Sequence, residues 1–175
     1  NWLVGNLDLN GFDQRITGLQ LNPNITDPTL ASRQAVTNSA AATTSTLTVS
    51  NETAFAFGGR LAEGAGSLAL VKQGAGTLSL GGANTYAGTT TIEAGTLAVN
   101  GTHTGGGLIT VQSGGTLGGT GTVGAVTVES GGSLSPGTSI GTLSAASTTW
   151  DGGATWAFEL GADGTSSDRL SLSGA

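Results

Sequence analysis

Apolar and polar residues alternate in short runs along most of the chain, and each run ends at one or two glycines. Thr77-Leu-Ser-Leu80 and Thr96-Leu-Ala-Val99 are two examples. A period of two places Leu78 and Leu80 on the same face of an extended strand. Glycine adopts positive φ easily, so the chain can bend sharply between such strands. The pattern predicts strands of about three to five residues separated by turns, and no long helix.

This pattern recurs at a nearly fixed interval. ITVQSGGTL at residues 109–117 aligns with VTVESGGSL at 126–134 at an offset of 17, and residues 76–80 align with 95–99 at an offset of 19. A unit of about 17 to 20 residues is too short for a pair of helices. A single unit offers its strands no opposing layer, so they must stack on neighbouring units. The sequence therefore predicts an all-β fold, a parallel β-helix (solenoid) of about eight or nine coils around one Leu and Val core.

An antiparallel β-sandwich is the alternative fold, but it favours longer strands and two-residue turns of the Asn-Gly type. The first 45 residues are less regular. Residues 6–12 and 16–21 are expected to form two strands about a turn, and residues 23–40 a loop-rich or longer coil. No shift in composition marks a boundary, so residues 1–175 are expected to be a single β-helix segment.

Composition narrows the possible classes of protein. The chain has 32 glycines but only 3 prolines, and glycine does not recur every third residue, which excludes collagen. It is 37% hydrophobic in regularly spaced positions, which argues against disorder. The net charge of −6 argues against nucleic acid and anionic membranes as partners. Cysteine is absent, which excludes disulfides and thiolate metal sites, and no leader or transmembrane stretch is apparent.

The segment GAGSLALVKQGAGTLSLGGANTYAGTTTIEAGTLAVN at residues 64–100 resembles the autotransporter-associated β-strand repeat. That repeat reads Leu-x-Lys-x-Gly-x-Gly-Thr-Leu-x-Leu, followed by Asn-Thr-Tyr-x-Gly-x-Thr and Gly-Thr-Leu. Residues 7–14 and 131–143 look like further phrases of such passengers. The positions that match the repeat are Leu70, Lys72, Gly74, Gly76, Leu78, Leu80, Asn84, Tyr86, Gly88, Thr90, Gly95 and Leu97.

The resemblance implies a right-handed β-helix that is part of a larger autotransporter passenger, an adhesin secreted by the type V route. The signal peptide and the C-terminal β-barrel are expected to lie outside this chain, which would contact the outer membrane only through that barrel. The implied location is extracellular, at the bacterial cell surface or released from it. The implied role is a structural or adhesive stalk, with glycans or neighbouring copies of itself as partners.

Several motifs that carry chemistry in other proteins occur here without their structural context. Ser139 lies in a Gly-x-Ser-x-Gly run, but no helix is expected after it and the only histidine, His103, precedes it. The Gly-x-Gly-x-x-Gly of residues 119–124 leads into an expected strand rather than a helix. Val123 stands where a calcium-binding nonapeptide needs aspartate. His103 is expected to be an exposed loop residue. No catalytic residue and no cofactor site is predicted.

The acidic residues give no metal site and no acid pair for catalysis. Glu93 and Glu129 occupy comparable positions, which suggests the acid pair of a glycosidase, but a role as solvated turn residues that discourage strand-edge aggregation explains them better. Asp163 and Asp168 are expected to lie in a solvated loop rather than to bind a cation. The chain is therefore not expected to be an enzyme, although a scaffold for a polysaccharide-degrading or other enzymatic passenger remains an alternative.

The aromatic residues give the one candidate contact with a ligand. Trp150 and Trp156 share strand parity around the Asp151-Gly-Gly turn and would be able to stack on sugar rings. A carbohydrate-binding surface module is therefore the second alternative, while a plug for the end of the core is the more ordinary explanation. Thr-x-Thr pairs beginning at residues 46, 89, 102 and 120 do not follow the coil period, so they predict no hydroxyl ladder.

Overall fold

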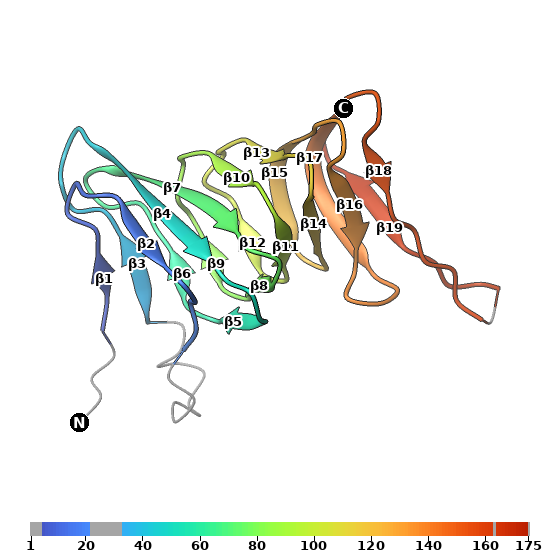
Figure 1. Cartoon of the computed structure of the whole chain (residues 1–175), viewed down its shortest axis with the longest axis horizontal. Coiled ribbons are helices and arrows are strands. Elements are labelled where there is room, and N and C mark those ends of the chain that lie inside the picture. Colours follow the sequence, from blue (N-terminus) through green and yellow to red (C-terminus); the bar gives the residue numbers. More distant parts are fainter. Residues whose placement is uncertain (1–4, 22–32, 163, 175) are drawn as a thin grey trace.

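The structure is a computed structural model in which residues 5–21, 33–162 and 164–174 are described. The chain winds through stacked coils, each with up to three short strands, and the stack forms an elongated body (Figure 1). Every pair of strands in the described part is parallel, whereas two isolated bridges between single residues are antiparallel. This pairing confirms the predicted all-β parallel β-helix, and the alternative of an antiparallel sandwich is wrong.

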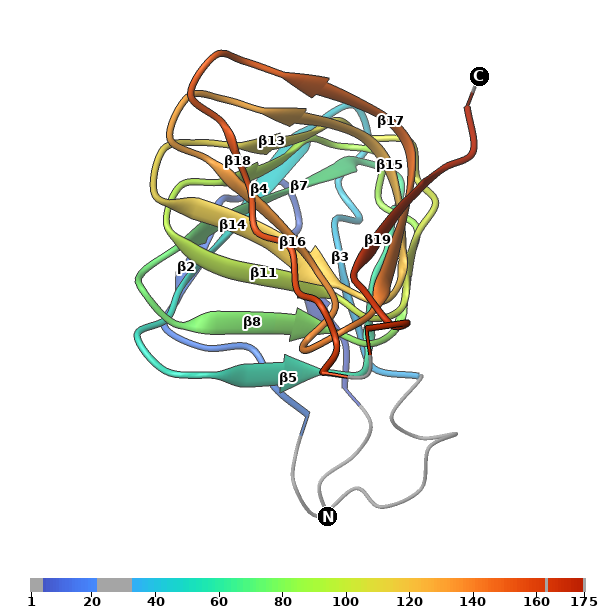
Figure 2. The ribbon, with the colours of Figure 1, turned by 90° about the vertical axis from the view of Figure 1, so that its right-hand side faces the viewer.

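The coils have three sides, which Figure 2 shows almost end-on. We call them face 1, face 2 and face 3 in the order in which the chain meets them. Face 1 contains β1 (Leu7–Asp8), β3 (Ala35–Thr37), β6 (Arg60–Leu61), β9 (Ala83–Asn84), β12 (Thr102–His103) and β19 (Arg169–Leu172), together with the first residues of β15 (Thr122–Val128) and β17 (Thr142–Trp150).

Face 2 contains β2 (Gln14–Ile16), β4 (Thr44–Ser50), β7 (Ser67–Gln73), β10 (Thr90–Ile92) and β13 (Ile109–Val111), and then the second halves of β15 and β17. Those two long strands turn the corner between faces 1 and 2, which joins part of face 1 to the ten-stranded sheet. Face 3 is a six-stranded sheet of β5 (Phe55–Phe57), β8 (Thr77–Leu80), β11 (Gly95–Val99), β14 (Gly115–Gly119), β16 (Ser133–Pro136) and β18 (Thr155–Trp156).

The inward residues of successive coils stack in columns because the register is kept from coil to coil. On face 3, Leu78 pairs with Leu97, which pairs with Leu117 and then with Leu134. All four leucines are buried, as period-two alternation predicts. Burial of one such side chain contributes about 1.5–3 kcal/mol. The columns of all three faces meet in a single apolar core.

The coil length varies more than the repeats predict. Ala83 pairs with Thr102, an offset of 19, but Leu7 pairs with Val36, an offset of 29, and Thr142 pairs with Arg169, an offset of 27. The described residues therefore complete seven coils and begin an eighth with β19. The expected number was about eight or nine, and the difference arises because the first and last coils contain long connections.

The N-terminal region differs in detail from its expected strands. β1 and β2 are both present, but they follow one another around a coil, and the second ends at Ile16 instead of extending to residue 21. The segment 23–40, expected to be a loop-rich or longer coil, belongs to the longer coil between Leu7 and Val36 and contains β3, whose Val36 is buried between the coils of β1 and β6. Residues 22–32 lie outside the described part. Among the described residues no helix is long and apolar enough to span a membrane.

Candidate functional site

A groove lies on the outer surface of face 3. In this part of the sheet β8, β11, β14 and β16 run side by side (Figure 2). Its volume is about 300 Å³. The sheet provides the floor, and the segment that follows β16 provides a wall. The residues that line the groove are Thr77, Thr96, Ala98, Thr116, Gly118, Ser135, Pro136, Gly137, Thr138, Ser139 and Glu159.

One side of the floor is a row of hydroxyl groups. Thr77 pairs with Thr96, and Thr96 with Thr116, so that successive coils present the same outward side chain. The row continues through Ser133 to Thr155. Neighbouring strands lie about 4.8 Å apart, which fixes the rise from one hydroxyl to the next. Thr77, Thr96 and Thr116 are half-buried, whereas Thr155 at the end of the row is exposed.

The hydroxyl row, here called the threonine row, was missed by the sequence analysis. Its signal is the Gly-Thr-Leu phrase, which recurs at Gly76, Gly95 and Gly115, as Gly-Ser-Leu at Gly132, and therefore follows the coil period. The Thr-x-Thr pairs that were considered are a different set of residues. A period-matched search for single threonines would have found the row, because one outward residue per coil is enough to form a ladder.

The other side of the floor is low because its residues are small. The outward positions next to the threonine row are Ser79, Ala98, Gly118 and Ser135. A Cβ at Gly118 would lie 2.7 Å from the carbonyl oxygen of Ser135, so that position has no room for a side chain. The close packing of the coils therefore requires small residues here, and these small residues leave the hollow between the threonine row and the wall.

The wall begins at Gly137, where the chain leaves the sheet. Gly119 and Gly137 form two backbone hydrogen bonds of 3.1 and 2.8 Å in an antiparallel bridge, and Gly137 has a φ of +88°. The loop that follows projects from the rod between β16 and β17 (Figure 1). Thr138 and Ser139 are exposed on it.

A single buried carboxylate connects this loop to the segment that carries Glu159. Asp168 is only 3% exposed. Its Oδ1 accepts a hydrogen bond from the backbone N–H of Gly141, and its Oδ2 accepts one from the N–H of Glu159, both at 2.9 Å. The N–H of Asp168 donates to the carbonyl of Glu159. Asp168 was expected in a solvated loop; it instead holds two parts of the groove together, and Asp163 lies outside the described residues.

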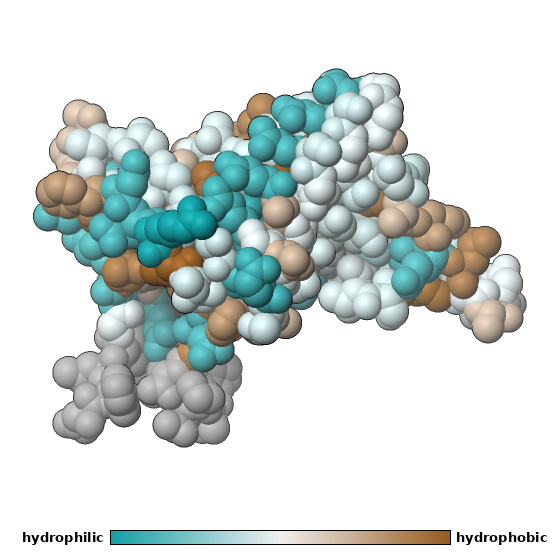
Figure 3. All heavy atoms as spheres, viewed as in Figure 1, coloured by the Kyte–Doolittle hydropathy of each residue, from teal (hydrophilic) through white to brown (hydrophobic). Residues whose placement is uncertain are grey.

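Trp150 and Trp156 do not line the groove but occupy core columns at the C-terminal end. Trp150 pairs with Val128, and Trp156 pairs with Leu134, both of which are fully buried. The two indole rings stack at 6.2 Å, and Phe158 contacts Trp156 edge-on at 5.9 Å. Trp150 and Trp156 are nevertheless 37% and 47% exposed, because no described coil covers them. Apolar surface gathers on the projecting segment beyond β18 (Figure 3).

His103 was expected to be exposed, and that prediction is wrong. The side chain is 4% exposed, because its strand parity places it inward beside Asn84 of the preceding coil. Its ring packs against that of Tyr86 with the centroids 4.4 Å apart and the planes tilted by 36°. Its Nε2 contacts the Tyr86 carbonyl at 3.2 Å, and its Nδ1 has no hydrogen-bond partner among the described residues. Burial lowers the pKa of His103 and raises the pKa of Tyr86, whose hydroxyl pairs with Thr90 at 2.6 Å.

Lys72 is a second buried polar group, and the alternation that buries Leu70 also points it inward. Its Nζ donates to the backbone carbonyls of Gln73, Gly74 and Ala94 at 2.7, 2.8 and 3.2 Å. Burial lowers the pKa of Lys72, although the carboxylate of Glu52 opposes the shift. All the donors of the ammonium are used by the turn, so Lys72 has a structural role.

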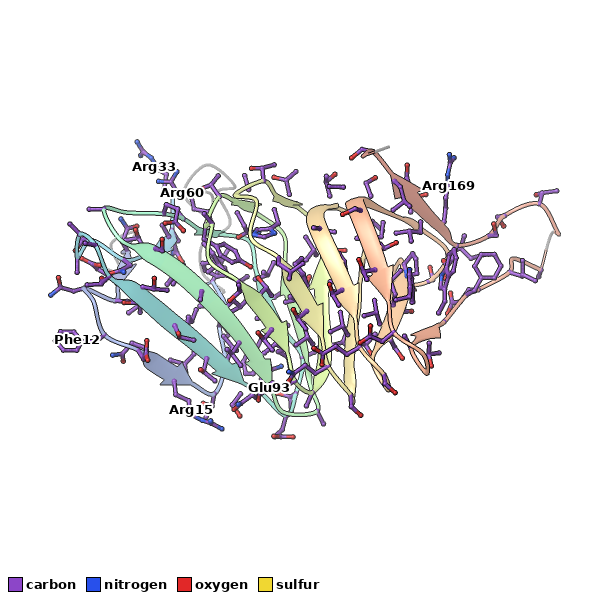
Figure 4. The ribbon with its side chains drawn as sticks, turned by 90° about the horizontal axis from the view of Figure 1, so that it is seen from above. Phe12, Arg15, Arg33, Arg60, Glu93 and Arg169 are labelled. Carbon is purple, nitrogen blue, oxygen red and sulfur yellow. The ribbon has the colours of Figure 1, made fainter. Side chains whose placement is uncertain are left out.

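The remaining candidates lie apart from one another. Glu93 and Glu129 belong to one outward column but are separated by the coil of Gln112, and Gln73 donates to Glu93 at 2.6 Å. The segment after Ser139 enters β17, and residues 119–124 connect β14 to β15, so neither motif opens a helix. The labelled arginines are spread over both ends of the rod (Figure 4). In the described part no three metal-binding side chains come together.

Comparison with known proteins bears on one segment. Residues 70–99 match the family model of the passenger-associated-transport-repeat. The chain contains an autotransporter passenger repeat. The matched segment covers β8 to β11 and the buried Lys72, Tyr86 and Asn84, which agrees with the predicted resemblance. No curated protein matches the chain. The passenger-associated repeat indicates an autotransporter passenger, and such a passenger is a secreted or cell-surface protein.

Proposed function

We propose that the chain is a structural and adhesive stalk of an autotransporter passenger, displayed outside the bacterial cell. The observation that carries this proposal is the single apolar core that continues through all the described coils. Each coil is held by the coils on either side of it, so the stack is a stiff spacer whose length depends on the number of coils. Its flanks present hydroxyl groups and backbone rather than clustered charge.

Surface display is tested in the bacterium that makes the protein. Antibodies against the chain should label intact cells, and external proteinase K should remove that label while a periplasmic marker stays intact. A strain in which residues 1–175 are deleted in frame should adhere less well to its substratum. Label that appears only after lysis would contradict surface display, and unchanged adhesion would contradict the adhesive role alone.

We also propose that the chain is not itself an enzyme. The support is the separation of Glu93, Glu129, Ser139 and His103, since catalytic groups must converge within hydrogen-bond reach. The purified chain should show no turnover of ester, peptide or polysaccharide substrates. Turnover that is lost in Ser139→Ala or Glu93→Gln would overturn this proposal.

Carbohydrate binding by the tryptophan pair is a second candidate function. The stacked rings of Trp150 and Trp156 are exposed over more than a third of their surface, and such rings stack on sugars. A glycan array with the purified chain tests this idea. Selective binding that Trp150→Ala abolishes would support it, and binding that survives the substitution would exclude the pair as the site.

A further inference from the structure

We infer that the groove on face 3 binds a segment of neutral glycan one or two hexose rings long, a function that goes beyond that of a stalk. Ligand pockets have volumes of about 300–1,000 Å³. The groove, at about 300 Å³, lies at the lower end of this range and suits a short segment rather than a large ligand.

The lining has the two kinds of surface that a sugar ring needs. Thr77, Thr96 and Thr116 present hydroxyl groups in a row, and a hydroxyl both donates and accepts hydrogen bonds, as sugar hydroxyls do. Ala98 and Pro136 present small apolar surfaces where the C–H groups of a ring can lie. A few convergent polar groups beside apolar surface are what fixes the orientation of a ligand in a selective pocket.

The charge of the groove selects against anionic sugars. Among the described residues that line the groove, Glu159 is the only ionisable one, and its carboxylate accepts hydrogen bonds without donating any. The whole chain carries a net charge of −6, which also repels anions. A uronic or sialic acid would therefore bind less well than a neutral hexose, whose hydroxyls can donate to the carboxylate.

The groove is held in shape before any ligand arrives. Asp168 bonds to Gly141 and to Glu159, and the antiparallel bridge of Gly119 and Gly137 fixes the start of the wall. A site that is already ordered loses little conformational entropy on binding. A weak polar ligand can therefore be bound by a few hydrogen bonds.

A glycan fits this surface better than an extended peptide does. A peptide usually adds to a sheet through the free backbone groups of an edge strand. The groove instead lies on the face of the sheet, where the backbone groups of β8, β11 and β14 already pair with their neighbours. Only side-chain hydroxyls and small apolar groups are presented there, which are contacts that a sugar can use.

Face 2 offers a matched control within the same molecule. Its outward column also has successive threonines, Thr91, Thr110, Thr127 and Thr149, in register. The groove is lined from face 3 and the wall, with no contribution from this column. Both faces therefore carry hydroxyl rows with the spacing of the coils, and the hollow bounded by Glu159 distinguishes face 3.

The experiment is a titration of the purified chain with cellotriose, maltotriose and trigalacturonic acid, followed by calorimetry and by saturation-transfer NMR. We expect at least one neutral trisaccharide to bind with a Kd of about 1 mM or lower, and the acidic one to bind more weakly. Thr96→Val removes one hydroxyl and should weaken binding about three- to tenfold, which is the value of one hydrogen bond. Ala98→Leu fills the floor and should abolish binding.

Two control variants locate the site. Thr110→Val and Thr127→Val each remove the same group from face 2, and both should bind as the unchanged chain does. The inference is overturned if no neutral trisaccharide binds, if the acidic one binds best, or if Thr110→Val or Thr127→Val weakens binding as much as Thr96→Val. Circular dichroism of each variant shows whether the fold is retained, and a retained fold with unaltered binding in Ala98→Leu would also overturn it.

Discussion

The corner between faces 2 and 3 is built in two different ways along the rod. In the N-terminal half, buried side chains bind the carbonyls of the turn: Asn51 donates to Thr53 and Thr77, and Lys72 donates to three further carbonyls. Glycines of positive φ lie at this corner in both halves, Gly74 and Gly95 as well as Gly114, Gly131 and Gly153, but in the described C-terminal half they act without a buried side-chain donor. The N–H of Gly114 donates to Gly131, and that of Gly131 donates to Gly153, each at 3.0 Å.

The difference shows two ways to satisfy buried backbone groups at a bend. A polar side chain brings its own donors, but it must be desolvated and fully paired. A glycine brings no side chain, and its positive φ turns the backbone N–H toward the next coil without steric cost. The N-terminal half is therefore sensitive to loss of one specific side chain as well as to changes at its glycines, whereas the C-terminal half depends on its glycines alone.

The largest expected effect comes from Lys72→Met, which keeps the length of the side chain but removes the ammonium. The carbonyls of Gln73, Gly74 and Ala94 would lose their donor. We expect a loss of about 2–4 kcal/mol in the free energy of unfolding, measured in urea, because buried acceptors would be left unpaired. Arg60→Met, at an exposed cation of face 1, should change stability by less than about 0.5 kcal/mol. Equal effects would refute the buried role of Lys72.

Gly114→Ala tests the glycine corner and should have the next largest effect. Gly114 has a φ of +86°, and its added Cβ would meet no atom closer than 3.8 Å, so the cost would come from the backbone alone. We expect a loss of about 1–2 kcal/mol for the left-handed conformation. Gly114→Asn should cost less, since asparagine tolerates this region. Gly152→Ala, which meets no atom within 4 Å, should be close to neutral.

A pH dependence should appear around the buried His103. Burial lowers the pKa of His103 below its value of 6.5 in the unfolded chain. As the pH falls, His103 therefore gains its proton in the unfolded chain before it does so in the folded chain. The stability that neutral His103 contributes above pH 6.5 is lost as the pH falls from 6.5 toward the lowered pKa of the folded state. Hydrogen exchange at pH 7.5 and 5.0 should show β9 and β12 opening more easily at the lower pH.

His103→Phe keeps a ring against Tyr86 and should remove that pH dependence. Asp8, whose hydrogen bonds with Ser39 and Asn10 lower its pKa below 3.8, stays ionised throughout this interval. Exchange that changes equally in β14 and β16, or that still changes in the His103→Phe variant, would refute the assignment to this side chain.

The smallest expected effect comes from the outward threonines. Thr96→Val and Thr110→Val keep a β-branched side chain on faces 3 and 2, so each should alter stability by less than about 0.5 kcal/mol. Matched urea midpoints for the two variants would show that any difference in glycan binding does not arise from unfolding. A larger loss in Thr96→Val would mean that its hydroxyl supports the sheet.

The sequence was informative where the structure depends on local alternation and repetition. Parity placed Leu78 and Leu80 inward, and the 17- to 20-residue period indicated parallel stacking, which is a nearest-neighbour property. The same parity placed His103 inward, but the flanking glycines and threonines led to the wrong prediction of an exposed loop. Burial there depends on Tyr86, which lies a coil away.

The groove could not have been predicted from local patterns. The threonine row has a sequence signal, but the wall depends on Asp168. This residue accepts hydrogen bonds from Gly141, which is 27 residues away in the sequence, and from Glu159, which is 9 residues away. These contacts depend on how the long connection between β18 and β19 folds back on the rod, and the coil period of the sequence does not predict the path of that connection. Irregular connections interrupt the repeat, and this is where the structure adds most to the sequence.

The parallel register of face 3 has a consequence for how such a surface can change in size. Each added coil would extend the threonine row by one step of about 4.8 Å without altering the coils already present. Duplication of a single unit would therefore lengthen the hydroxyl track, whereas insertion of one residue within a strand would turn its leucines outward. A rod of this kind can evolve by whole units far more readily than by single residues.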